Sequence, residues 1–267
     1  MKKIIWFVLS SFVLFVTAGC FDTVEEVTIN DNGSGVYKES MDMGKMFGMA
    51  KAMGGDNKEL KEMEKLKTDT VINLKDVADS LKDLSVAEKK LIETGKLNVN
   101  IDAEKEKFSF LFSFPFAKTD DITAIRNLLK KTKSSILSST MDDKFSSGKE
   151  KQKGLFDEEE GDGSKEMIGA DLEDYFMISY AKNKISHKVN KQKAANVKDD
   201  KSLKSLQEMS QMGMGLNLKT VYNLPKPAKK AEGKGVKLSD DRKTVIIEGT
   251  FEDFFEDPSY FEYEIEY

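Results

Sequence analysis

Cysteine, histidine and tryptophan each occur once in this 267-residue sequence, as Cys20, His187 and Trp6. Without a second cysteine the chain cannot form an internal disulfide, so its stability has to come from packing. One cysteine and one histidine are also too few for the common zinc sites, which are built from several such ligands. The composition therefore excludes disulfide scaffolds and zinc sites rich in Cys and His.

Long hydrophobic runs are equally scarce, and the clear one lies at the start of the chain. Lys2 and Lys3 precede fifteen mostly apolar residues, 4–18. As a helix this run would span roughly 22 Å, which is short of a hydrocarbon core of about 30 Å. A positive start, a short apolar segment and small residues at its end are typical of an export signal. We therefore predict that residues 1–19 are a signal peptide.

The end of this segment, Val16-Thr17-Ala18-Gly19-Cys20, resembles the lipobox of bacterial lipoproteins, with Thr17 where these proteins usually carry Leu, Val or Ile. The resemblance implies that Cys20 receives a diacylglyceryl group and becomes the first mature residue. A lipid bilayer is then a partner of the protein. The expected location is the cell envelope, anchored by lipid, with the outer membrane favoured over the inner.

Positive charge is in deficit once the signal peptide is set aside. Of the 42 Lys and Arg residues two lie in the signal, which leaves 40 against 47 Asp and Glu, a net charge of −7. Such a chain is unsuited to a nucleic-acid backbone or to a surface of anionic headgroups. We expect no nucleic-acid partner, and lipid rather than charge should hold the protein at a membrane.

The mature chain, residues 20–267, is long enough for one domain with a sizeable core. Alternating and β-branched segments between turn residues predict strands. The first two form a hairpin around a glycine-rich turn at 31–35, and a second hairpin turns at Lys182-Asn183. The predicted strands cover 24–30, 36–40, 68–74, 97–102, 108–116, 175–180, 185–190, 216–224, 234–238, 243–249 and 261–267.

The clearest strand pattern is a run of five phenylalanines at every second position. Residues two apart on a strand point to the same face, so all five side chains share one face. A face of this kind is ordinarily buried, and we expect it to form the centre of the core. A solvent-exposed aromatic platform for sugars or lipids is the alternative. The five residues are Phe108, Phe110, Phe112, Phe114 and Phe116.

Apolar residues at three- and four-residue spacing predict helices between these strands. Ser85 and Glu88 form a capping box at the start of one of them. Because hairpins and helices occur in runs rather than in strict alternation, we predict an α+β fold, a mostly antiparallel sheet with helices packed on one face. The predicted helices cover 41–53, 57–67, 75–84, 85–94, 119–139, 199–212 and 252–256.

Residues 141–168 differ in composition from the rest of the chain, with few residues to bury. We predict a mobile acidic insertion there. Its run Asp157–Asp162 suggests calcium, but a calcium loop counted from Glu158 would place Gly169 where a bidentate glutamate is required. A solvated charge run is the better interpretation, and no cofactor is expected.

Methionines offer the one alternative with a defined chemistry. Thioethers are soft ligands that select Cu(I), and an exported protein could meet copper. Methionine at helical spacing is also ordinary core filling, which we favour because no His or Cys lies nearby. The weak candidates for a metal site are Met43, Met46, Met49, Met53, Met209 and Met212.

Catalytic signals are few. His187 has no free cysteine as a partner once Cys20 is acylated, and no nucleophile-elbow sequence is present, so we expect it at the surface or rim.

The segments 224–227 and 239–245 loosely resemble uncharacterised envelope lipoproteins of Bacteroidota-type bacteria. The leading hypothesis is therefore a non-enzymatic envelope lipoprotein that binds or assembles with an envelope protein. A copper-binding protein and a hydrolase that uses unrecognised carboxylates remain the alternatives.

Overall fold

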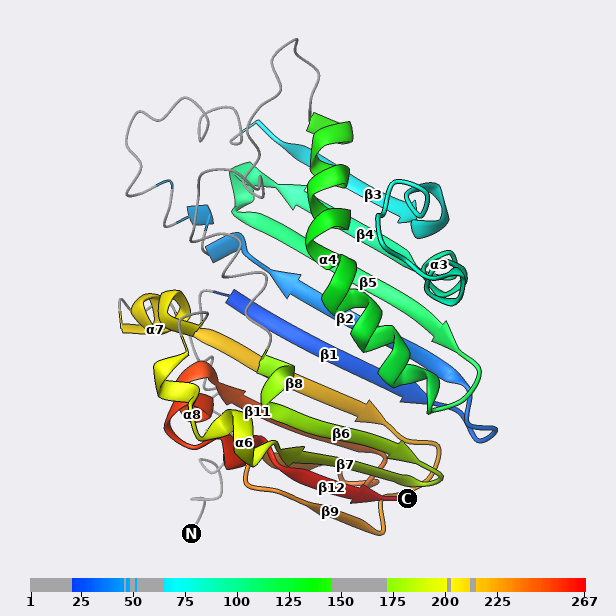
Figure 1. The fold of residues 1–267 in the computed structure, drawn as a ribbon, viewed down its shortest axis with the longest axis vertical. Coiled ribbons are helices and arrows are strands. Elements are labelled where there is room, and N and C mark those ends of the chain that lie inside the picture. The colour runs from blue at the N-terminus through cyan, green and yellow to red at the C-terminus, as the bar shows by residue number, and fades with distance from the viewer. Residues whose placement is uncertain are drawn as a thin grey trace, which may run out of the picture.

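The computed structural model describes residues 21–45, 47–48, 51, 65–145, 172–200, 203–211 and 215–267. These residues form the predicted α+β fold, but their strands belong to two sheets rather than one (Figure 1). The larger sheet contains β1 (Phe21–Ile29), β2 (Gly35–Asp42), β3 (Lys67–Asn73), β4 (Lys96–Asp102), β5 (Lys107–Phe116), β8 (Leu216–Asn223), β10 (Val236–Leu238) and β11 (Thr244–Thr250). The smaller sheet contains β6 (Phe176–Ala181), β7 (Lys184–Val189), β9 (Lys230–Glu232) and β12 (Tyr263–Glu266).

The strand order of the large sheet is β10-β11-β8-β1-β2-β5-β4-β3, and that of the small sheet is β6-β7-β12-β9. Hairpins account for the neighbours β1–β2, β4–β5, β6–β7 and β10–β11, all of them antiparallel. Both predicted hairpins are therefore confirmed. Among the described residues, the one parallel pair joins β1 to β8 at the centre of the sheet, where Val27 lies beside Tyr222.

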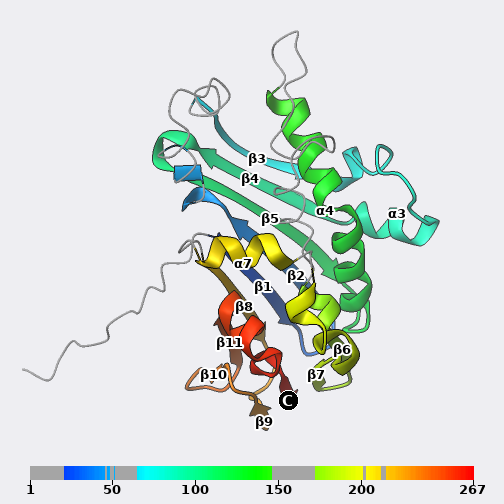
Figure 2. The same cartoon turned by 60° about the vertical axis from the view of Figure 1, so that its left-hand side comes forward.

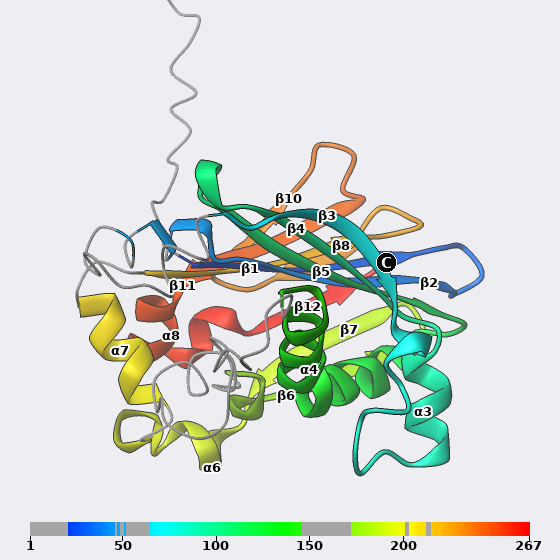
Figure 3. The same cartoon turned by 90° about the horizontal axis from the view of Figure 1, so that it is seen from above.

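The helices lie on one face of the large sheet, on the same side as the small sheet (Figure 3). The longest, α4, crosses the strands diagonally, and β6 packs beside it (Figures 1 and 2). The predicted stripe of α4, residues 122, 125, 128 and 129, is buried. The α-helices are α3 (Val86–Ile92), α4 (Asp121–Phe145), α6 (Lys191–Ala194), α7 (Lys204–Gln211) and α8 (Phe251–Glu256). Short 3-10 turns are η1 (Leu74–Asp76), η2 (Ala103–Lys105), η3 (Leu172–Tyr175), η4 (Val197–Asp199) and η6 (Pro258–Phe261).

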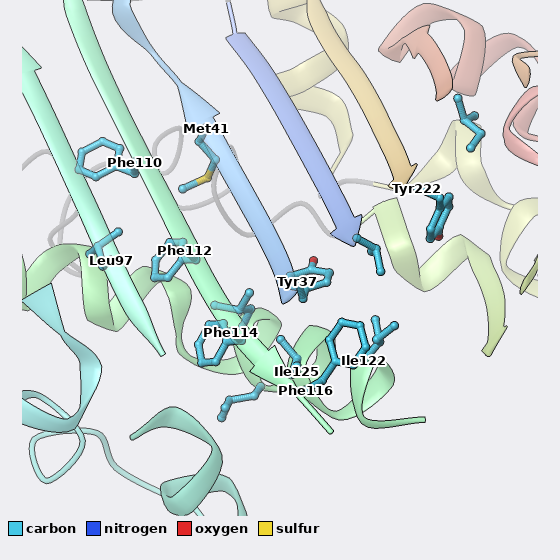
Figure 4. Packing of buried hydrophobic residues seen from close by; sticks show 14 of the residues in the cluster. Tyr37, Met41, Leu97, Phe110, Phe112, Phe114, Phe116, Ile122, Ile125 and Tyr222 are labelled. Atoms are coloured by element: carbon cyan, nitrogen blue, oxygen red, sulfur yellow. The ribbon is translucent and has the colours of Figure 1, made fainter. Parts of the chain in front are cut away.

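All five phenylalanines of β5 are buried in the core, as predicted. Figure 4 shows four of them, Phe110, Phe112, Phe114 and Phe116. Strand register explains the packing: Phe112 lies opposite Leu97 of β4 on one side and Glu39 of β2 on the other. Val99 and Ile101 continue the same face of β4. The layer is closed by α4, whose Ile122 and Ile125 are fully buried.

The opposite face of the large sheet, here called the open face, carries the alternate residues of the same strands. Leu111 of β5 lies between Asn98 of β4 and Ser40 of β2, and Ser40 lies beside Val24 of β1. These side chains are partly exposed. No described helix covers them (Figure 3). One solvated face is common for antiparallel sheets and accounts for the polar half of the strand alternation.

Several predicted segments need correction. Residues 75–84 do not form a helix; only the turn η1 is regular there, and Ala78 and Leu81 are buried within irregular backbone. The first five residues of the predicted insertion, 141–145, belong to α4, and residues 146–168 lie outside the described residues. The predicted helix 57–67 lies mostly outside them too, and its last residue begins β3.

The capping box of α3 is confirmed: the Glu88 backbone N–H donates to the Ser85 hydroxyl, and the Ser85 N–H donates to the Glu88 carboxylate. The α7 helix is shorter than predicted, beginning at Lys204. Within the described part of the chain, no helix is long and apolar enough to cross a bilayer.

The orientation of β5 can be tested by truncating two adjacent side chains. Phe112→Ala should lower the free energy of unfolding by about 3–5 kcal/mol, because it leaves a cavity between the sheet and α4. Leu111→Ala is the matched control on the open face and should cost about 1 kcal/mol or less. Denaturant titration of both variants at one pH measures the difference. Equal losses at the two positions would contradict the inward orientation of the phenylalanines.

Candidate functional site

Charged residues occupy the core-facing side of three elements. Strand alternation places Glu25 on the same face of β1 as Val27, and Glu39 on the same face of β2 as Tyr37. On α4, Arg126 lies within the apolar stripe, next to Ile125 and four residues after Ile122. Glu25, Glu39 and Arg126 are each less than a tenth exposed. A charge is expensive to bury unless it is paired, so each requires a partner inside the protein.

Arg126 is the centre of the resulting network. Its Nε and Nη2 atoms donate to Oε1 of Glu173 in η3, at 2.9 and 2.6 Å. Nη2 also donates to Oε2 of Glu25, at 2.5 Å. Nη1 donates to the hydroxyl of Tyr180 in β6, at 2.9 Å. One guanidinium group therefore joins the large sheet, the long helix and the first strand of the small sheet.

A second ion pair lies seven residues along the same face of α4. Lys133 Nζ donates to Oε1 of Glu39, at 2.5 Å, and the Tyr37 hydroxyl donates to Oε2 of Glu39, at 3.3 Å. Glu39 lies directly opposite Glu25 in the β1–β2 ladder. Like charges opposite each other destabilise a strand pair, so Arg126 and Lys133 compensate this arrangement. We call Glu25, Glu39, Arg126, Lys133 and Glu173 the charge cluster.

A chain of tyrosine hydroxyls extends the network between the sheets. The Tyr180 hydroxyl is 3.3 Å from that of Tyr222 in β8, which is 2.7 Å from that of Tyr263 in β12. Burial raises the pKa of all three phenols above the usual value of such groups. They consequently stay neutral at physiological pH and serve as hydrogen-bond donors and acceptors.

The charge cluster holds three carboxyl groups and two cations. Burial alone would lower the pKa of Arg126, but Glu173 and Glu25 outweigh burial and raise it well above its usual range. Burial raises the pKa of Glu25 to about 8, although Arg126 opposes the rise. The second oxygen of that carboxyl, Oε1, is buried without a hydrogen-bond partner. These observations favour a protonated Glu25 at neutral pH.

The prediction that His187 lies at the surface or rim is wrong. It is 7% exposed in β7, and its ring stacks between those of Phe176 and Tyr263, at centroid distances of 4.2 and 4.8 Å. Its Nδ1 is 2.7 Å from the Phe261 carbonyl oxygen, which fits a neutral ring donating from Nδ1. Burial lowers the pKa of His187 to about 3, so the ring stays neutral across the physiological range.

The candidates drawn from the sequence are not brought together by the described structure. Met43 is buried in the core beside Phe47, in agreement with core filling at that position. Cys20 and the other five methionines lie outside the residues whose side chains the structure describes. In the described part of the chain, no group of three His, Cys, Asp or Glu side chains is arranged to hold a metal ion.

The most exposed side chain of the charge cluster is that of Glu173, at 39%, against 20% for Lys133. Glu25 and Arg126 are buried. What the arrangement can do chemically is hold and release a proton, since a buried carboxyl with a raised pKa is the group that changes charge near neutrality. Perturbed pKa values mark functional sites but also occur in structural ion networks. The many contacts that tie this cluster to separate elements favour the structural role.

Removing the central cation should destabilise the protein strongly. Arg126→Met keeps an apolar stem but leaves Glu173 and Glu25 without their donor, so the free energy of unfolding should fall by about 3–5 kcal/mol. Lys130 is the matched control: it lies one turn later on α4 and pairs with Asp174 at the surface. Lys130→Met should cost about 1 kcal/mol or less. Denaturant titration measures both variants. Similar losses would show that the buried contacts of Arg126 do not account for its contribution to the free energy of unfolding.

Comparison with known proteins adds no assignment for these residues. No protein-family model matches the chain, and neither a curated protein nor a solved structure is significantly similar to it. The interpretation of the cluster consequently rests on its contacts, burial and charges.

Proposed function

We propose that this protein is a lipoprotein of the cell envelope, anchored through acylated Cys20, with a non-catalytic binding or assembly role. The observation that carries the proposal is the position of β1. It begins at Phe21, directly after Cys20, and is hydrogen bonded to β2 on one side and β8 on the other. Successive Cα atoms are about 3.8 Å apart, so a lipid on Cys20 would be joined to the central strand pair without a linker.

A structural role for the buried polar groups supports the non-catalytic part of the proposal. Arg126 is held by Glu173, Glu25 and Tyr180, and His187 is held by a backbone carbonyl and two aromatic rings. A general base has to reach the proton that it removes. His187 and Glu25 are instead enclosed by the elements that they join.

We assign the binding role to the open face of the large sheet. It is left uncovered by the described helices and by the small sheet (Figure 3). Short polar side chains such as Ser40 and Asn98 lie there beside apolar ones such as Val24 and Leu111. Such a mixture matches the average polarity of a non-obligate protein interface, which resembles the rest of a protein surface.

The anchor is tested by Cys20→Ser. Without the thiol no thioether to a diacylglyceryl group can form, so the variant should leave the membrane fraction and take up no labelled fatty acid. The wild type should fractionate with membranes and incorporate the label. Lipid anchoring would be rejected if the wild type takes up no labelled fatty acid and the Ser variant stays in the membrane fraction.

The binding surface is tested by photo-cross-linking in intact cells. A photoreactive amino acid at position 111, on the open face, should give cross-linked products with another envelope protein. The same group at position 131, an exposed site on α4, serves as the control and should give none. Products from position 131 alone would place the binding surface on the helical side instead.

A further inference from the structure

We propose that the charge cluster is a proton-controlled joint, in which the folded protein keeps a proton on Glu25 at neutral pH and releases it when the small sheet and η3 separate from β1 and α4. This inference concerns the interior of the fold and does not depend on the lipid anchor or on the binding surface. It rests on the contacts of the five residues of the charge cluster and on the strands and helices that those contacts join.

The geometry makes Glu25 share its cation with a second carboxyl group. Lys133 is taken by Glu39, and Arg126 is shared between Glu25 and Glu173. Glu173 is partly solvated, with its side chain 39% exposed. Glu25 is enclosed, and its Oε1 is buried without a hydrogen-bond partner among the described residues. An ionised Glu25 would hold a buried charge that shares Arg126 with Glu173 and has no hydrogen-bond donor at Oε1, and a proton on Glu25 removes that charge.

Each described element that packs against Glu25 contributes a group that acts on it. The phenols stay neutral because burial raises their pKa values, and Arg126 stays charged. Arg126 helps burial to lower the pKa of His187 in β7, so this ring stays neutral. The groups facing Glu25 are Tyr37 and Glu39 from β2, Arg126 from α4, Glu173 from η3, Tyr180 from β6, Tyr222 from β8 and Tyr263 from β12.

The sign of the pH dependence follows from the direction of the shift. Burial raises the pKa of Glu25 from about 4.5 to about 8. Between these two values the folded state therefore binds one more proton than the open state. The stability that Glu25 contributes is fully present below pH 4.5 and is lost as the pH rises toward 8. Between these values the equilibrium constant for opening increases by up to tenfold per pH unit.

His187 acts in the opposite direction over part of this range. Burial lowers its pKa from 6.5 to about 3, so between those values the open state binds the extra proton and stability rises with pH. The two effects nearly cancel from pH 5 to 6.5 in any opening that exposes both side chains. Above pH 6.5 His187 is neutral in both states, and the effect of Glu25 remains alone.

At the joint, the protonation state of Glu25 affects how η3 and β6 are held to β1 and α4. Glu173 lies three residues before the start of β6, and Tyr180 lies within β6. Both are held by the guanidinium that also holds Glu25. Loss of the proton places a charged Glu25 in competition with Glu173 for Arg126. We therefore expect η3 and β6 to loosen before the rest of the large sheet does.

The experiment measures the stability of the mature protein and of two variants between pH 5 and 9. In the wild type, the unfolding constant from denaturant titration should be almost flat from pH 5 to 6.5 and should rise about tenfold from pH 6.5 to 9. Glu25→Gln keeps the shape without the titration, so its unfolding constant should fall from pH 5 to 6.5 and stay flat above.

Glu39→Gln is the matched control. It removes the opposite carboxyl of the same strand pair and leaves Glu25 intact, so the rise above pH 6.5 should persist. The rise should end at a lower pH, because the charge of Glu39 helps to raise the pKa of Glu25. A wild type with no rise above pH 6.5, or a Glu25→Gln variant that keeps the rise, would overturn the proposal.

Two further measurements do not depend on global unfolding. The side-chain carboxyl resonance of Glu25 in 13C-labelled wild type should titrate with a midpoint well above that of an ordinary glutamate. Amide hydrogen exchange, corrected for its intrinsic pH dependence, should show β6 and η3 opening more often above pH 6.5, while β5 is unchanged. A Glu25 resonance that titrates in the ordinary range, or an equal change in β5, would reject the joint.

Discussion

The guanidinium of Arg126 is the constraint on which the arrangement of the two sheets depends. It is buried, and it keeps its charge because β1, η3 and β6 each supply one of its acceptors. A buried ion without its partners costs several kcal/mol, so an arrangement that misplaces any of these elements is disfavoured as a whole. Apolar contacts alone would tolerate sliding of the small sheet against α4, whereas a forked donor with three acceptors favours one position.

Much of the fold could be predicted from local patterns. The phenylalanines of β5 and the stripe of α4 repeat with periods that belong to one secondary structure each. The helix predicted at 75–84 does not form, although Val77, Leu81 and Leu84 have helical spacing. There the Leu74 N–H donates to the carbonyl of Gly95, and Asp83 adopts a left-handed conformation, with φ 59°. The division into two sheets had no local signal, because alternation within a strand does not specify its neighbours.

The charge cluster has a signal in the sequence. Glu25, Glu39 and Arg126 interrupt apolar faces, and a charge on such a face implies a buried partner. Pairing them would still have required the tertiary structure, since Glu25 and Arg126 are 101 residues apart. His187 was misplaced because its strand neighbours Ser186 and Lys188 are polar. Alternation makes those neighbours point away, so they say little about the face that His187 occupies.

The parallel pairing of β1 with β8 has a consequence for how the chain reaches this structure. Asp22 and Asn217, which are hydrogen bonded across that pair, are 195 residues apart in the sequence. One edge of β1 therefore stays unpaired until β8 has been synthesised. Contacts of such long range slow folding, and an unpaired edge can join other chains in the meantime. A chain arrested before β8 would lack the partner of its first strand, so this protein should depend more than a helical one on holding factors until its C-terminal third is complete.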